Sequence, residues 1–141
     1  MNDPYRLDRF VKAQESVFEE VLSELRAGRK RSHWIWFIFP QLKGLGHSAM
    51  AQDYGITSRE EAEAYLQHPV LGPRLKECTQ LVNAVEGRSI DAILGYPDDL
   101  KFRSSMTLFA LVAPEEVVFK NALRKYFSGE LDQLTVQRLV Q

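Results

Sequence analysis

The sequence has little cysteine, since Cys78 is the one cysteine among 141 residues. An internal disulfide is therefore excluded, and a lone thiol is typical of proteins from a reducing compartment. The first ten residues, MNDPYRLDRF, also lack the basic and then apolar pattern of a secretory signal peptide. We therefore expect a cytoplasmic protein.

Long apolar runs and an excess of charge of one sign are missing as well. No unbroken apolar run is longer than the six residues from Trp34 to Phe39, whereas a membrane-spanning helix needs about 20 apolar residues. We therefore expect no membrane span. The net charge is −1, from 18 Lys and Arg against 19 Asp and Glu. Because nucleic-acid binders usually carry a strong basic excess, this balance argues against nucleic acid as a partner.

Several patterns of catalytic and metal sites are also absent. The histidines at positions 33, 47 and 68 lack the spacing of zinc ligands, and neither GxxxxGK[ST] nor GxGxxG occurs. Cys78 falls on the apolar face of a predicted helix, which is typical of an inert thiol. A triad of Ser104, His33 and Asp99 lacks the GxSxG turn around its serine. We expect no metal, no cofactor and no nucleophilic cysteine.

The residues that are present favour a helical fold. Hydrophobic residues make up 45% and charged residues 26% of the chain, which is the balance of a globular protein. Apolar residues recur at spacings of three and four. The predicted helical segments include 6–27, 58–68, 71–85, 89–94, 100–113, 114–127 and one from 132 onward. The sequence thus predicts an all-α or mainly α fold, a single globular domain over 1–141 that forms a compact bundle of about seven helices.

The segment SHWIWFIFPQ, residues 32–41, holds both tryptophans. Periodicity cannot decide whether residues 33–39 form a helix or a strand, although the helices predicted on both sides favour a short helix. Trp, Ile and Phe are typical core residues. Two indole N–H groups nevertheless need partners, and His33 and Gln41 add polar groups at the ends. We expect a core segment whose ends border a pocket, with Trp34 and Trp36 as its aromatic wall.

The segment DDLKFRSSMT, residues 98–107, is the second candidate. If Asp98 or Asp99 caps a helix, Lys101, Ser104 and Ser105 occupy its first two turns, where backbone N–H groups attract anions. The alternative is a capped helix whose hydroxyl groups only pack against neighbours. Gln14 falls on an apolar helix stripe and needs a hydrogen-bond partner there, which is either the backbone or a ligand.

Together these segments predict a pocket for a small polar anionic or nucleotide-like ligand. If the ligand is hydrolysed, His33 is the candidate catalytic acid–base, because an imidazole titrates near physiological pH. One alternative is a non-enzymatic protein-interaction module with an unknown partner. Nucleic-acid binding is a third possibility, because Arg29, Lys30 and Arg31 precede the tryptophans and basic residues beside aromatic rings can bind single strands.

Four strings closely resemble a small bacterial family, the domain of unknown function 1810 family, whose members often carry the label calpastatin. They are DRFVKAQ, SHWIWFIFPQLKGLG, EAEAYLQHPVLGPRL and DDLKFRSSMTLF. The resemblance covers about residues 8–139 and implies a compact, mainly helical fold, but no established activity, substrate or cofactor. Calpastatin is a long disordered chain, unlike this composition. Helical domains of the NADAR type, which act on ADP-ribose derivatives, share only size and helical character with the present chain. That likeness is an analogy and carries no functional evidence.

Overall fold

The computed structural model describes residues 2–140, and ten α-helices are found there. They are α1 (Asp8–Glu15), α2 (Phe18–Arg26), α3 (Ile35–Ile38), α4 (Ala49–Asp53), α5 (Arg59–Gln67), α6 (Leu71–Ala84), α7 (Ile90–Leu94), α8 (Asp98–Val112), α9 (Val117–Phe127) and α10 (Gln133–Leu139). A lone parallel bridge joins Leu42 to Ile56, and no longer strand pairing occurs within 2–140. The predicted mainly helical fold is confirmed, whereas the prediction of about seven helices is wrong.

The first predicted segment, 6–27, accounts for part of this difference because it is two helices. α1 ends at Glu15 and α2 begins at Phe18. Val17 between them has φ −121° and ψ −6°, which is outside the helical range. The apolar spacing of the segment continues through the break, so the sequence pattern alone did not reveal it.

Side-chain caps set several of the helix starts. The side chains of Ser48, Ser58, Ser89 and Asp132 each accept a hydrogen bond from a backbone N–H in the first turn of the following helix. The start predicted at residue 114 is wrong. Residues 114–116 form a turn closed by the hydrogen bond from the Glu116 N–H to the Ala113 carbonyl, and α9 follows it.

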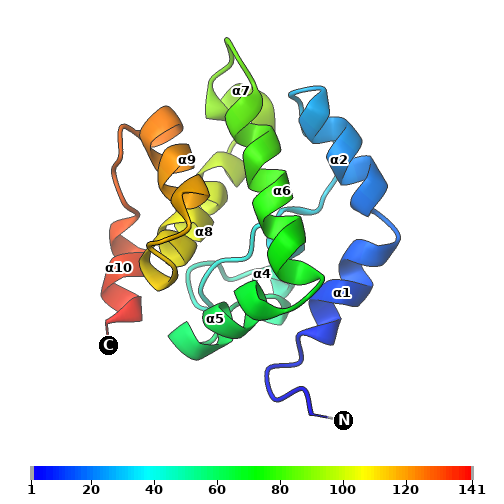
Figure 1. The fold of residues 1–141 in the computed structure, drawn as a ribbon, viewed down its shortest axis with the longest axis vertical. Coiled ribbons are helices and arrows are strands. Elements are labelled where there is room, and N and C mark those ends of the chain that lie inside the picture. The colour runs from blue at the N-terminus through cyan, green and yellow to red at the C-terminus, as the bar shows by residue number, and fades with distance from the viewer. Residues whose placement is uncertain (1, 141) are drawn as a thin grey trace.

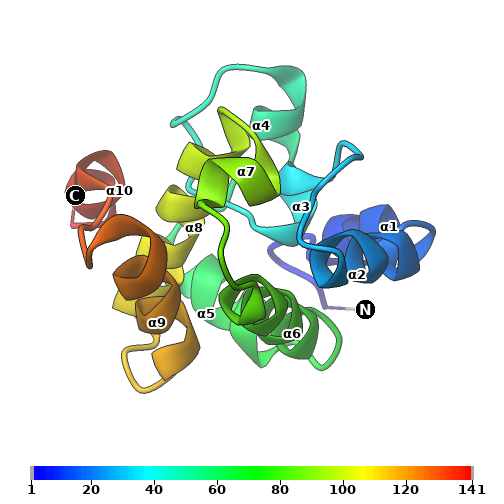
Figure 2. The ribbon, with the colours of Figure 1, turned by 90° about the horizontal axis from the view of Figure 1, so that it is seen from above.

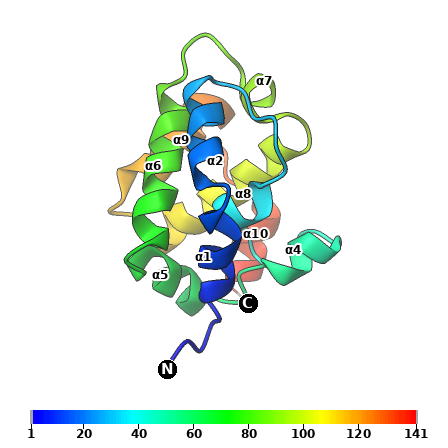
Figure 3. The same ribbon diagram turned by 90° about the vertical axis from the view of Figure 1, so that its right-hand side faces the viewer.

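Helix α8 lies at the centre of the contacts between helices, since it packs against α3, α5, α7, α9 and α10. Figure 1 shows α6 along the long axis, with α1 and α2 on one side and α8, α9 and α10 on the other. Seen from above, α3, α4 and α7 lie on the face opposite α6 (Figure 2), and α4 projects from that face (Figure 3). In the described range, none of the helices has the length and hydropathy that a membrane span requires.

The aromatic run belongs to the core. Trp34, Phe37 and Phe39 are buried, and the rings of Phe39 and Phe102 meet edge to face with centroids 4.8 Å apart. Burial of one such side chain stabilises the fold by roughly 1.5–3 kcal/mol. The run therefore attaches α3 to α8, and this contact brings the two candidate segments together.

Candidate functional site

Two lysines and two tryptophans surround one aspartate where α3 meets the start of α8. The Nζ atom of Lys30 lies 2.7 Å from one carboxylate oxygen of Asp98, and Nζ of Lys101 lies 3.4 Å from the other. Each ammonium also stands over an indole, with Lys30 5.0 Å from the ring centroid of Trp34 and Lys101 4.9 Å from that of Trp36. These are cation–π distances. We call Lys30, Trp34, Trp36, Asp98 and Lys101 the lysine–tryptophan cluster.

The two tryptophans differ in how far their rings are exposed and in whether the indole N–H has a hydrogen-bond partner. Trp34 is 1% exposed, and its indole N–H donates to Oε1 of Glu24 at 3.0 Å. Trp36 is partly exposed, and its Nε1 is buried without a hydrogen-bond partner among residues 2–140. Trp34 is therefore a structural residue, whereas Trp36 retains exposed ring surface and a buried indole N–H without a partner in the described residues.

The Glu24 carboxylate holds the backbone that leads into the cluster. It accepts hydrogen bonds from the backbone N–H groups of Arg31 and Ser32, from the Ser32 hydroxyl and from Trp34. Burial by itself raises the pKa of this carboxyl, but the hydrogen bonds together outweigh burial and lower the pKa to about 2. Glu24 thus stays ionised at neutral pH and fixes the position of residues 31–34.

From the sequence, Lys30 is a candidate only for nucleic-acid binding, as part of the basic triplet 29–31, and not for this pocket. It stands in the basic triplet 29–31, which resembles a solvated loop, yet its side chain is only 7% exposed. Its backbone N–H also donates to the carbonyl of Ile93 at 2.7 Å. A single lysine inside an exposed basic run carries no periodic signal, so only the fold shows that it faces Asp98.

Exposed apolar side chains border the cluster at the first turn of α8. Tyr96 is 78% exposed and Leu100 is 47% exposed. They lie four residues apart, beside Asp98 and Lys101 in the sequence. Aromatic and aliphatic surface is therefore accessible at the start of α8, the end of the helix that holds Asp98 and Lys101.

Asp99 also lies at this end of α8, with Oδ1 buried and without a partner in the described part of the chain. Burial raises the pKa of its carboxyl, and the charges of Asp91 and Asp98 act in the same direction, while the backbone N–H of Leu100 opposes them. Its proton affinity is thus higher than that of an ordinary aspartate.

The two serines of the second candidate segment face other neighbours. The Ser104 hydroxyl lies 3.2 Å from both the Leu100 carbonyl and Oδ2 of Asp132, the N-cap of α10. Ser105 is fully buried, and its Oγ has no hydrogen-bond partner within 2–140. Ser104 therefore links α8 to α10, whereas Ser105 lies one turn after Lys101 on the same face of α8.

The remaining predicted residues take no part in the ion pairs and cation–π contacts of the cluster within residues 2–140. Gln14 is buried, donates to the Phe37 carbonyl at 2.7 Å and to the Tyr65 hydroxyl at 3.2 Å, and accepts from Arg74 at 3.3 Å. Its hydrogen bonds are thus made inside the protein. Gln41 is buried at the Leu42–Ile56 bridge, where its carbonyl accepts from the Ile56 N–H. His33 is exposed.

No group of three His, Cys, Asp or Glu side chains in the described residues is arranged to hold a metal ion. The chemistry that the cluster offers is instead that of two cations, an aromatic face, an indole donor and a carboxylate.

Comparisons with known proteins agree with the resemblance noted in the sequence. No curated protein matches the chain. The crystal structure of the conserved hypothetical protein Rv1873 from Mycobacterium tuberculosis is similar to it, with 59% sequence identity, a TM-score of 0.97 and 99% of each chain covered. The family model described as protein of unknown function DUF1810 matches residues 4–139. The chain therefore belongs to the DUF1810 family.

Proposed function

We propose that the lysine–tryptophan cluster binds a small anionic, nucleotide-like ligand. The observation that supports this proposal is the stacking of Lys101 on Trp36, which joins the two candidate segments at one point. Trp36 would stack on the base or another planar group, and base–aromatic stacking contributes about 1–3 kcal/mol. Tyr96 would add a second ring from the exposed rim.

The anionic part of the ligand would compete with Asp98 for the two ammonium groups. Lys30 and Lys101 share this one carboxylate, and a partly exposed ion pair is worth only about 0–1 kcal/mol. A phosphate can therefore replace the contact of Lys101, whose side chain is 25% exposed, at little cost, whereas the Lys30 side chain is only 7% exposed. The positive end of the 15-residue helix α8 acts in the same direction.

Hydrolysis of the ligand is a further step of the proposal, for which His33 remains the candidate acid–base. A second candidate function is protein interaction, which is favoured by the exposure of Tyr96, just before α8, and of Leu100 in its first turn. Such a surface would bind a partner protein without chemistry.

The test is a thermal shift with AMP, ADP, ADP-ribose and inorganic phosphate, in which indole fluorescence is read in parallel. A ligand at 100 times its Kd stabilises the folded state by about 2.7 kcal/mol, which corresponds to a Tm rise of several degrees for a chain of this size. The shift should vanish in Lys101→Met and weaken in Trp36→Phe. It should persist in Lys12→Met, because Lys12 is an exposed lysine of α1 whose one ion pair is with Asp8.

Two results would contradict the proposal. One is the absence of any shift with the wild-type protein, and the other is an equal shift in wild type and Lys101→Met. A third result would favour the interaction module. In that case neither wild type nor any variant shows a thermal shift with nucleotides, and Tyr96→Ala abolishes binding to a purified partner protein.

A further inference from the structure

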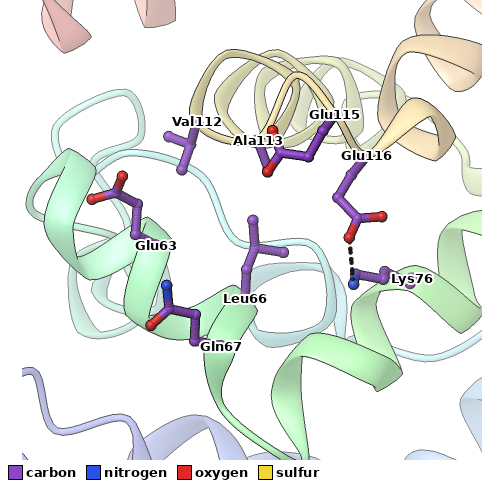
Figure 4. Close-up of a pocket in the computed structure, with 8 residues that line it drawn as sticks. All are labelled: Glu63, Leu66, Gln67, Lys76, Val112, Ala113, Glu115 and Glu116. Atoms are coloured by element: carbon purple, nitrogen blue, oxygen red, sulfur yellow. Dashed lines mark hydrogen bonds and ion pairs between the residues drawn. The ribbon is translucent and has the colours of Figure 1, made fainter.

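A cavity of about 280 Å³ lies at the opposite end of α8 from the lysine–tryptophan cluster. A helix of 15 residues is about 22 Å long, so the two sites are separate. The walls of the cavity come from α5, α6, the end of α8 and the turn that precedes α9. It is lined by Glu63, Leu66, Gln67, Lys76, Val112, Ala113, Glu115 and Glu116 (Figure 4).

The lining combines apolar side chains with carboxylates. Figure 4 shows Leu66 and Val112 directed into the space between Glu63 on one wall and Glu115 on the other. The carboxylates of these two glutamates come from different elements, α5 and the turn before α9. A ligand in the cavity would thus meet methyl groups in the middle and a carboxylate on either side.

The charge of the cavity is negative. Its one lysine, Lys76, is paired with Glu116 at 2.8 Å. No basic group of residues 2–140 lies within ion-pair distance of Glu63 or Glu115, since neither takes part in a salt bridge there. Two carboxylates therefore remain without a countercharge.

The end of α8 adds to this negative potential. A helix carries about half a negative charge at its C-terminus, and the last turn of α8 contains no basic residue. Arg59, which is outside the lining, donates a long hydrogen bond of 3.5 Å from its guanidinium to the Leu111 carbonyl. That contact satisfies one carbonyl, and Arg59 makes no ion pair with Glu63 or Glu115.

We infer that this cavity binds a small aliphatic polyamine, whose methylene chain lies on Leu66 and Val112 while its ammonium groups meet Glu63 and Glu115. The inference follows from charge complementarity and from the apolar surface between the two charges. An anion would be repelled at this position, and a compact inorganic cation would leave the apolar surface unused. A lysine side chain of another protein has the same chemistry, so the test includes it as a separate arm.

The experiment is isothermal titration calorimetry of the full chain with 1,4-diaminobutane and spermidine at low and high salt. Butylamine serves as the probe with one charge, and N-acetyl-lysine methylamide as the probe for a protein side chain. We expect the diamine to bind at least ten times more tightly than butylamine, and the affinity to fall as salt screens the charges. Either no diamine binding at low salt or an equal affinity for butylamine would overturn the inference. Tighter binding of the lysine probe than of the diamine would also overturn the assignment to a free polyamine.

Variants connect the binding to the cavity. The double variant Glu63→Gln with Glu115→Gln should weaken diamine binding at least tenfold, while Glu77→Gln, an exposed glutamate of α6 outside the lining, should leave it unchanged. Lys76→Met should strengthen binding, because it frees the carboxylate of Glu116. A merely structural role of the glutamates would not produce this opposite effect. Unchanged binding in the double variant, with a normal unfolding transition, would overturn the inference.

Discussion

The indole N–H of Trp34 donates a hydrogen bond of 3.0 Å to the carboxylate of Glu24, and both side chains are buried. This contact joins the aromatic run to α2. It also explains why the two tryptophans have different roles, because Trp34 is committed to the interior and Trp36 alone faces Lys101 with part of its surface exposed.

The Glu24 carboxylate should make stability depend on pH in acid. Its pKa in the folded protein is about 2, below the ordinary value of 4.5, so its ionised form is stabilised by folding. That contribution is complete above pH 4.5 and is lost as the pH falls toward 2. At about 1.4 kcal/mol per pKa unit it amounts to a few kcal/mol at most.

Urea unfolding of wild type and Glu24→Gln from pH 7 to pH 3 measures this contribution. The variant should be less stable at pH 7, and the difference between the two proteins should shrink below pH 4.5. The matched control is Glu19→Gln, an exposed residue of the same helix. A difference that stays constant down to pH 3 would contradict the assigned pKa.

Acrylamide quenching should separate the two indoles. Trp36→Phe leaves Trp34, which is almost fully buried, as the one fluorophore of its type. We expect the Stern–Volmer constant of the variant to be several times smaller than that of wild type, because a buried ring excludes the quencher. If the remaining indole were quenched as strongly as the pair, Trp34 would have to be accessible.

Gly72 should be intolerant of any side chain. A Cβ atom at this position would lie 2.0 Å from the Leu66 carbonyl oxygen and 2.9 Å from its carbon, both of which are backbone atoms at the junction of α5 and α6. Gly72→Ala must therefore move one helix relative to the other, and we expect the free energy of unfolding to fall by about 3 kcal/mol or more.

Gly87→Ala is the matched control for this substitution. Gly87 has φ +74°, but no atom lies within 4 Å of its added Cβ, so the expected cost is only the left-handed backbone, about 1–2 kcal/mol. Calorimetric unfolding compares the two variants. If Gly72→Ala and Gly87→Ala lost the same free energy of unfolding, the contact between α5 and α6 would be able to relax.

Cys78 should be unreactive in the native protein. The pKa of its thiol is raised to about 12, first by burial and second by the charge of Glu77, while Arg74 opposes both. Thiolate is the reactive form, so labelling with Ellman's reagent at pH 8 should be negligible until urea unfolds the chain. Native labelling at the rate of free glutathione in the same buffer would contradict the buried position.

Local signals explain which helices could be predicted. Ser58, Ser89 and Asp132 cap their helices because the hydrogen bond joins residues three apart, and such a contact is visible in the sequence. The break at Ser16–Val17 was missed because the apolar spacing continues through it. The start of α9 was placed too early, since Pro114 suits the first turn of a helix as well as the turn that it occupies.

The sequence by itself determined the helical class, the caps, the burial of the aromatic run and the pairing of Lys101 with a helix start. Only the tertiary structure decided that Lys30 turns inward to Asp98, an aspartate 68 positions away in the chain. It also decided that Glu24 accepts the hydrogen bond of the Trp34 indole and that Glu63 and Glu115 line one cavity. The physical reason is one of range. Propensity and capping act within one helical turn, whereas the partner of a charge is selected by the packing of helices that are distant in sequence.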